Sequence, residues 1–356
     1  MKNENLMQMY YGMQPDALRN TAEQGEETFH RIRTALSAAE PEKVILLGIG
    51  SSCHSACLAE REFHALARRP VICRTPETAI RLLSDFDEKT LVIAVSQSGT
   101  STNTLNAMRE IRSAGAVVFA VTQGMDSPVA KEAQEVIPLF IPDEKTGPKT
   151  MGVMASVCSL LLIAAAMSGK KDAWESLRSD LTAEADAMAE NLTVARDWTL
   201  ALEDLLCREA SWMVVGQRAA YPAAGESALK ITETVRRTAA CYELEEAVHG
   251  PCASFVSRPA LLCLCPAGED EIRPEALCRA CEAKGGHAYR AGMTRGPARA
   301  EGTRLSMTYR TERLGVLQLL LPAQAVSAWI SPKMGIDLDQ KENDPFRAIL
   351  AGHLET

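Results

Sequence analysis

Hydroxyl side chains crowd the end of one apolar run, and they are the first residues here that could do chemistry. The run VIAV at residues 92–95 is followed by SQSGTSTNT, in which most side chains carry a hydroxyl. Ser51 and Ser52 follow an earlier apolar run, KVILLGIG, in the same way. Hydroxyls beside the free N–H groups of a helix N-terminus bind a phosphate monoester well. One hydroxyl per helix would be ordinary N-capping, so the excess favours phosphate binding.

A second set of candidate groups lies in residues 227–251, SALKITETVRRTAACYELEEAVHGP. Lys230 and Glu233 are three positions apart on a predicted helix, so their side chains share a face. His249 precedes a Gly-Pro pair and is a predicted loop histidine, a residue type that exchanges protons near neutral pH. The spacing alone favours a helix-surface ion pair and an incidental histidine over an acid/base pair, and it leaves both interpretations open.

The elements that must position these groups are those of a parallel α/β protein. Continuous apolar runs that end in small or hydroxyl residues, with helical spacing between them, are typical of buried parallel strands and their crossover helices. Residues 149–168 are apolar all round and are predicted to form a buried helix. The predicted strands cover residues 43–50, 70–75, 91–96, 117–123 and 136–142.

The same plan starts again at Trp212. An offset of 168 pairs Gly48 with Gly216, and after a drift of one residue Gly99 stands opposite Gly268. The predicted fold class is therefore α/β, with two doubly wound parallel-sheet domains in tandem. The predicted boundaries are 1–26 for an N-terminal segment, 27–170 for the first domain, 171–204 for a helical connector, 205–330 for the second domain and 331–356 for a C-terminal tail.

Only the first copy carries the hydroxyls. Ala219 and Ala220 stand where the first copy has Ser51 and Ser52. Generic turn formers would appear in both copies, so the contrast favours a phosphate site in the first domain alone. In a doubly wound sheet these loops lie outside the carboxyl ends of the strands, where ligands bind. Arg218, in the loop of the second copy, is a weaker candidate for recognising an anionic substrate group.

Composition and charge exclude several classes of partner. A formal net charge of −8 and a pI near 5.5 argue against nucleic acid and anionic membrane surfaces. No apolar stretch is long enough to cross a bilayer, because the run at residues 160–167 is far too short. The first residues do not resemble a signal peptide, so we expect a cytoplasmic protein.

The cysteines and glycines do not form a convincing cofactor site. Cys278 and Cys281 make a CxxC on a predicted helix, and Cys263 and Cys265 alternate on a predicted strand, so packing is favoured over zinc or redox chemistry. The loop GIGSSC has two glycines of a dinucleotide-binding fingerprint but lacks the third. We therefore expect neither a metal nor an organic cofactor.

Taken together and in order, these motifs resemble a known family. GIGSSCHSA followed by SQSGTSTNT is similar to the sugar isomerase (SIS) domain, and two such domains in tandem resemble the isomerase half of glucosamine-6-phosphate synthase. YPAAGESALKITE, EEAVHGP and GIDLDQ extend the resemblance over most of the chain. The resemblance implies a phosphorylated sugar or amino sugar as substrate. It also implies a homodimer, or a higher homo-oligomer, with shared active sites.

The resemblance further implies a role for each candidate residue. Glu233 would move a proton between sugar carbons one and two, with Lys230 beside it in the catalytic group. His249 would open the sugar ring from the neighbouring subunit, and Glu246 would orient His249 or contact sugar hydroxyls. The residues implied to hold the phosphate are Ser52, Ser96, Gln97, Ser98 and Ser101, and those implied to line the substrate are Gly50 and Ser51.

The chain departs from the synthase in ways that predict a different reaction. It has no glutaminase domain, and no lysine follows Lys341 to form an imine with a ketose, a task that His353 cannot perform. The segment GPKTMGVMAS also lacks the glutamate that the synthase has near Thr150. A substrate that already carries its amine does not need that lysine, so the chain resembles the stand-alone fructosamine-6-phosphate deglycases. An aminosugar-6-phosphate deaminase/isomerase and a non-catalytic phosphosugar sensor remain open as alternatives.

Overall fold

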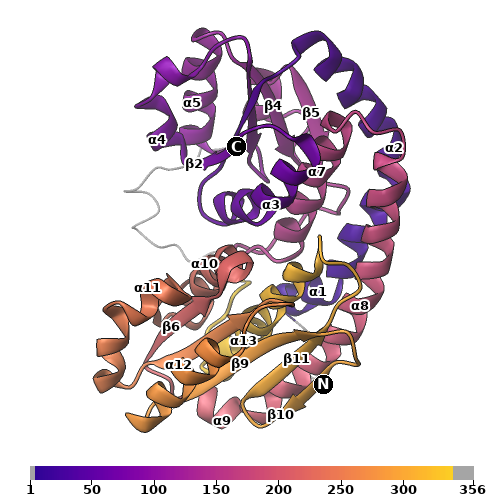
Figure 1. Cartoon of the computed structure of the whole chain (residues 1–356). Helices are drawn as coiled ribbons and strands as arrows, with labels where there is room; N and C mark the ends of the chain where they lie inside the picture. The colour runs from indigo at the N-terminus through magenta and orange to yellow at the C-terminus, as the bar shows by residue number, and fades with distance from the viewer. Residues whose placement is uncertain (1–4, 340–356) are drawn as a thin grey trace. The chain divides into compact units, whose positions relative to one another are not determined.

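The structure is a computed structural model that describes residues 5–339 of the 356-residue chain (Figure 1). Two compact units divide these residues between them. The first α/β unit contains residues 16–144 and 151–182, and the second α/β unit contains the other described residues. Lys341 and His353, on which the sequence argument about the tail depends, lie outside the described residues.

Two long helices, α2 (Gln14–Ala39) and α8 (Ala173–Ala201), each contribute residues to both units. The predicted connector over residues 171–204 is helical, and consists of α8 and the start of the short α9 (Glu203–Leu206). Helix α2 runs without a break across residues 26 and 27, where the sequence places the start of the first domain. The domain boundaries inferred from the sequence therefore stay a prediction.

The first unit contains a five-stranded, entirely parallel sheet in the order β2-β1-β3-β4-β5. All five predicted strands are confirmed. The predicted extension of the last strand to residue 142 is wrong, because β5 ends at Pro138, whose missing N–H cannot continue the ladder. The strands are β1 (Lys43–Leu47), β2 (Val71–Arg74), β3 (Thr90–Val95), β4 (Val117–Thr122) and β5 (Glu135–Pro138).

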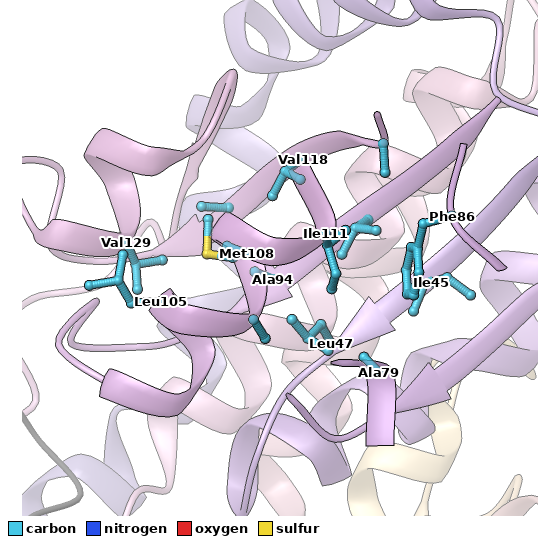
Figure 2. Close-up of a cluster of buried hydrophobic side chains, with 14 residues drawn as sticks. Ile45, Leu47, Ala79, Phe86, Ala94, Leu105, Met108, Ile111, Val118 and Val129 are labelled. Atoms are coloured by element: carbon cyan, nitrogen blue, oxygen red, sulfur yellow. The ribbon is translucent and has the colours of Figure 1, made fainter. Parts of the chain in front are cut away.

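Helices cover both faces of this sheet, as a doubly wound fold requires. Figure 2 shows the core on one face, where Leu105, Met108 and Ile111 of α5 point toward side chains of β1, β3 and β4. Helix α7 is buried along nearly its whole length, which confirms the prediction made from its apolar residues. The helices are α3 (Ser51–Ala67), α4 (Pro76–Ile80), α5 (Thr102–Ser113), α6 (Pro128–Glu132) and α7 (Met151–Met167), with a 3-10 turn at Leu83–Asp85.

The second unit repeats this topology with one addition. Its sheet has the order β10-β11-β9-β8-β6-β7, so the five strands β7-β6-β8-β9-β11 follow the same 2-1-3-4-5 order as the first sheet. The sixth strand, β10, pairs antiparallel with β11 through a turn at Gly302. The second sheet is therefore mostly parallel rather than wholly parallel. The strands are β6 (Ser211–Gly216), β7 (Thr238–Glu243), β8 (Ala260–Cys265), β9 (Ala288–Thr294), β10 (Arg299–Glu301) and β11 (Arg304–Thr308).

Several helices complete the second unit (Figure 1). Helix α10 passes directly into a π-helical turn at Ile231–Val235, and 3-10 turns occur at Arg218–Ala220, Pro251–Ser257 and Gly315–Leu320. The α-helices whose bounds have not yet been given are α1 (Leu6–Gly12), α10 (Tyr221–Lys230), α11 (Leu244–Val248), α12 (Ile272–Ala283) and α13 (Leu321–Lys333).

Equivalent glycines confirm the internal repeat. A Cβ on Gly48 would lie 2.7 Å from the backbone carbon of Ser52, and one on Gly216 would lie 2.4 Å from the backbone oxygen of Ala220. Each glycine thus lets the first strand of its sheet approach the helix that follows. Gly99 and Gly268 adopt positive φ values of 71° and 76°, which glycine reaches without steric cost.

The cysteines are free thiols, and five of them are buried. Cys263, Cys265, Cys278 and Cys281 lie in one hydrophobic cluster between β8 and α12, which confirms that they pack in the core. Among residues 5–339, no group of three or more histidine, cysteine or acidic side chains is arranged to hold a metal ion. In the same range, a helix both long enough and apolar enough to cross a membrane is absent.

Candidate functional site

The first unit brings its two hydroxyl-rich loops together at the edge where its strand order reverses. Strand β1 lies between β2 and β3, so the chain moves outward in one direction after β1 and in the other after β3. The loops that follow β1 and β3 therefore meet at the carboxyl ends of two neighbouring strands. A switch point of this kind is where doubly wound sheets bind their ligands.

Glycines shape both loops. Gly50 lies at the N-cap of α3 with φ 58° and ψ −132°, a conformation that strains any other residue. Gly99 also has positive φ, and a Cβ there would fall 1.9 Å from the hydroxyl oxygen of Ser127. The loop after β3 therefore packs against the loop after β4 in a way that only glycine permits.

Three helices begin beside the switch point, and their N-termini differ. Helix α5 is capped by Ser101, whose hydroxyl accepts the N–H of Thr104, and the Gly152 N–H at the start of α7 donates to Glu144 at 2.8 Å. Helix α3 has no side-chain cap, because its N-cap residue is Gly50. The first N–H groups of a helix have no partner within it, and a helix N-terminus without a side-chain cap is a type of position where proteins bind anions.

The predicted phosphate-binding residues all lie in these two loops or on the first turn of the following helix. Ser52 is half-buried on the first turn of α3, and Ser96 is buried at the end of β3. Ser98 is exposed, and its hydroxyl pairs with that of Thr100 at 2.8 Å. Ser101 caps α5, which is the ordinary N-capping role that was the alternative to phosphate binding. Its hydroxyl oxygen accepts both hydrogen bonds from Thr104, so its own hydrogen can still be donated.

Gln97 is held on both its backbone and its side chain. Its carbonyl oxygen accepts the N–H of Gln123 at 2.9 Å and the hydroxyl of Thr122 at 3.2 Å. Its side-chain Nε2 donates to Glu144 Oε2 at 3.0 Å. The sequence gives no local signal for Glu144, which lies 47 positions from Gln97 and in no recognisable motif.

The second unit places Lys230 and Glu233 in direct contact, as the spacing predicted. Lys230 Nζ lies 2.6 Å from Glu233 Oε2 and 3.4 Å from Glu226 Oε1. The side chains of Lys230 and Glu226 are 1% exposed, whereas that of Glu233 is 40% exposed. The ion pair is thus not the helix-surface pair considered from spacing, because Lys230 lies in the interior and only Glu233 reaches solvent.

The charge on Lys230 is stabilised by its neighbours. Burial disfavours the ammonium form, but the attraction of Glu226 and Glu233 outweighs burial and raises the pKa of Lys230 above its usual value. Lys230 is therefore a cation at neutral pH and has no lone pair with which to accept a proton. Its ammonium holds the side chain of Glu233 in a fixed position.

The turn that carries Glu233 is unusual. Residues 231–235 form a π-helical turn that ends at Arg236 with φ 56°. Such turns are rare and occur frequently at functional sites, since the extra residue redirects the side chains that follow. Glu226, which the sequence reasoning did not single out, lies four positions before Lys230 in ESALK, a spacing that places the two on one helix face.

His249 ends helix α11, and its side chain is exposed. Its Nδ1 lies 2.7 Å from the carbonyl oxygen of Glu245, and because a carbonyl can only accept, Nδ1 carries the proton. Nε2 is then the nitrogen left to exchange a proton. Within the described part of the chain, no hydrogen bond or ion pair joins His249 to Lys230 or Glu233, and the exposed Glu246 contacts His249 only through their backbones.

The switch point of the second sheet is built from charged pairs instead of hydroxyls. Arg218 follows β6 with φ 45°, and its guanidinium lies 3.1 Å from Glu269 in the loop after β8. A carboxylate of the chain itself therefore already pairs with the side chain proposed for an anionic group. The contrast between the two copies, seen in the sequence, extends to their electrostatics.

Comparisons with known proteins agree with this geometry. Residues 38–167, which contain β1 to β5 and both hydroxyl-rich loops, match the SIS domain. This part of the chain is similar to the SIS domain. A glutamine–fructose-6-phosphate aminotransferase (isomerizing) from Symbiobacterium thermophilum is 28% identical over 348 residues, which cover 93% of this chain and 56% of that protein. The chain thus spans about half the length of the relatives it matches.

Solved structures are similar in fold over both units. A candidate phosphosugar isomerase from Clostridium difficile 630 aligns with 98% of this chain and 99% of its own, with a TM-score of 0.85 and 21% identity. The C-terminal domain of glucosamine-fructose-6-phosphate aminotransferase from Francisella tularensis aligns with 95% of this chain and 99% of its own, with a TM-score of 0.75 and 18% identity. The predicted pair of doubly wound domains in tandem, and the resemblance to the isomerase half of the synthase, are confirmed.

Proposed function

We propose that this chain is a phosphosugar-processing enzyme, and that its reaction is the cleavage of a fructosamine 6-phosphate to a hexose 6-phosphate and a free amine. The observation that carries the proposal is the division of labour between the two copies of one fold. The SIS domain has an uncapped helix N-terminus ringed by hydroxyls, which suits a phosphate. The second unit has a partly exposed carboxylate, Glu233, fixed against a buried ammonium, which suits proton transfer.

The reaction proceeds in three steps. His249 assists the opening of the sugar ring by exchanging a proton at Nε2, which exposes the ketone at carbon two. Glu233 then removes a proton from carbon one, the electron pair shifts to form an enaminol, and return of the proton to carbon two leaves an imine at carbon one. Water adds to that imine and expels the amine, so carbon one becomes the aldehyde of the hexose phosphate.

The structure supports a different role for Lys230 from that of Glu233. Because Lys230 is almost wholly buried behind Glu233, it is out of reach of a substrate. We assign it to positioning: it holds the Glu233 carboxylate in place through the 2.6 Å contact. Glu226 balances the charge of Lys230 from the other side. The homodimer with shared sites, with His249 acting on the partner's substrate, belongs to the same proposal.

The test is release of glucose 6-phosphate from a panel of fructosamine 6-phosphates that carry different amino acids. Release is followed by coupling to glucose-6-phosphate dehydrogenase. Glu233→Gln should lower turnover by about 10²- to 10⁴-fold, the usual contribution of a general acid/base. Glu282→Gln, an exposed change on α12, is the matched control and should leave turnover intact.

Each other outcome points to a different function. Exchange of ammonia on glucosamine 6-phosphate, without release from any fructosamine, would replace the deglycase with a deaminase/isomerase. Binding of phosphosugars without turnover, unchanged by Glu233→Gln, would replace the enzyme with a sensor. Loss of turnover in Glu282→Gln as well would show that the Glu233 effect is not specific to that carboxylate.

A further inference from the structure

A buried carboxylate lies at the SIS switch point and takes no part in the proposed chemistry. Glu144 is 1% exposed, and its Oε2 accepts two hydrogen bonds, one from the Gly152 N–H at 2.8 Å and one from Gln97 Nε2 at 3.0 Å. One oxygen thus joins the loop after β3 to the start of α7. A carboxylate is seldom buried without a purpose that repays its desolvation.

The bond to Glu144 determines which way the Gln97 amide faces. An amide can present either its oxygen or its NH₂ group, and only the NH₂ group can donate to a carboxylate. With Nε2 bound to Glu144, Gln97 Oε1 lies against Gly152, where a Cβ would be 2.1 Å away. Glycine at position 152 leaves the space that the amide occupies. The second hydrogen on Nε2 stays available for another acceptor.

Glu144 also occupies the N-terminus of α7. The N–H of Gly152 lies in the first turn of that helix, where it could otherwise donate to an anion. With α7 bound by Glu144 and α5 capped by Ser101, α3 is left as the helix without a side-chain cap. The negative charge of Glu144 further disfavours an anion at α7. A phosphate is therefore not expected at the N-terminus of α7.

We propose that Glu144 is the positioning residue of the phosphate site: it orients the Gln97 amide in the loop after β3. The inference rests on the phosphate site of the proposed function, but not on the deglycase reaction. The carboxylate at the start of α7 comes from a residue eight positions before Gly152.

The test measures binding rather than turnover. Dissociation constants for glucose 6-phosphate, fructose 6-phosphate and unphosphorylated glucose are measured by calorimetry for the wild type, Glu144→Ala, Gln97→Ala and the double variant. Glu144→Ala should weaken binding of both phosphosugars by about tenfold, the value of roughly one net hydrogen bond. The double variant should bind no more weakly than Gln97→Ala alone, because Glu144 acts through Gln97.

A conservative variant separates positioning from simple stabilisation. Glu144→Gln keeps a carbonyl oxygen that can accept both N–H groups, so phosphosugar affinity should return to within about threefold of the wild type. Glu144→Asp keeps the charge but is one carbon shorter, so it should bind as weakly as Glu144→Ala. If Glu144→Ala does not fold, the comparison of Glu144→Gln with Glu144→Asp still tests whether the position of the side-chain oxygen determines phosphosugar affinity.

Three results would overturn the inference. The first is unchanged phosphosugar affinity in folded Glu144→Ala, with a lowered melting temperature alone, which would make Glu144 only a helix cap. The second is an additive loss in the double variant, which would show that Glu144 does not act through Gln97. The third is a wild type that binds neither phosphosugar. Failure of the deglycase assay with phosphosugar binding intact would overturn the proposed reaction and leave Glu144 in its role.

Discussion

Replacing Lys230 with methionine tests the buried ion-pair group most directly. Lys230→Met removes the ammonium but keeps a side chain of similar length. Glu226, also 1% exposed, then loses its ion-pair partner in the interior. Breaking a buried pair in this way costs about 3–5 kcal/mol, because the buried carboxylate loses the ammonium that it pairs with. For a unit of this size, that cost corresponds to a fall in Tm of roughly 10 °C.

Glu233→Gln should have a much smaller effect on stability than Lys230→Met. Glu233 is 40% exposed, so water screens its pairing with Lys230, and Lys230 keeps Glu226 in that variant. We expect a loss of at most about 1 kcal/mol. The two variants should therefore separate: Lys230→Met lowers both stability and turnover, whereas Glu233→Gln lowers turnover alone. The double variant Glu226→Gln/Lys230→Met, which removes both buried charges, should recover most of the stability.

The pH dependence of the stability difference follows from the raised pKa of Lys230. A cation whose folded-state pKa is above its unfolded value stabilises fully below the unfolded value, and that stabilisation is lost as pH rises through the folded value. The difference between the wild type and Lys230→Met should be constant from about pH 6 to about pH 9. It should shrink above the usual lysine value of 10.5.

Urea unfolding and thermal melts of the four proteins measure these differences. The prediction fails if the free energy of unfolding of Lys230→Met lies within about 0.5 kcal/mol of the wild-type value, the effect of an ordinary surface substitution. It also fails if Glu233→Gln lowers the free energy of unfolding as much as Lys230→Met does. That result would mean that the exposed Glu233, and not the buried Glu226, is the partner of Lys230 that matters for stability.

Two further predictions concern the loops and the assembly. Gly99→Ala should cost more than about 2 kcal/mol and abolish phosphosugar binding, because its Cβ would meet the Ser127 hydroxyl 1.9 Å away at a φ of 71°. Gly268→Ala is the control: Gly268 has φ 76°, and a Cβ there would meet nothing in the described part of the chain within 4 Å. It should lower the free energy of unfolding by about 1–2 kcal/mol and leave phosphosugar binding intact. If the two glycine variants had equal effects on melting temperature and on binding measured by calorimetry, the clash with Ser127 would not be the cause. Mixing inactive His249→Ala and Glu233→Gln subunits should restore about a quarter of wild-type turnover if sites are shared across a two-fold dimer, whereas mixed dimers without activity would show that they are not.

Much of the fold could be read from local patterns. Apolar runs such as residues 43–47 and 91–95 become buried parallel strands because both faces of each strand are covered by helices. The pairing of Gly48 with Gly216 and of Gly99 with Gly268 followed from the repeat, and the matching conformations confirm it. Local patterns did not predict where some elements end, as at Pro138 in β5. They also did not predict the antiparallel strand β10, which has three exposed residues and no apolar run to mark it.

The candidate site shows the same division. The hydroxyl residues, Lys230 and Glu233 were identifiable because their chemistry is compressed into single turns or helix faces, where sequence spacing is nearly spatial spacing. Glu226 lies four positions from Lys230 on the same helix face, so the same signal could have identified it. Glu144 had no such signal, since its partners Gln97 and Gly152 meet it only after the sheet has formed.

The sequence by itself determined the two-copy α/β plan, the confinement of the hydroxyls to one copy, and the pairing of Lys230 with Glu233. Only the tertiary structure decided that β1 and β3 are neighbours, that Lys230 is buried while Glu233 reaches solvent, and that Glu144 holds Gln97. Periodicity and turn chemistry act within a few residues, whereas strand order and burial depend on how distant segments pack. The contacts that orient this site therefore exist only once the chain has folded around them.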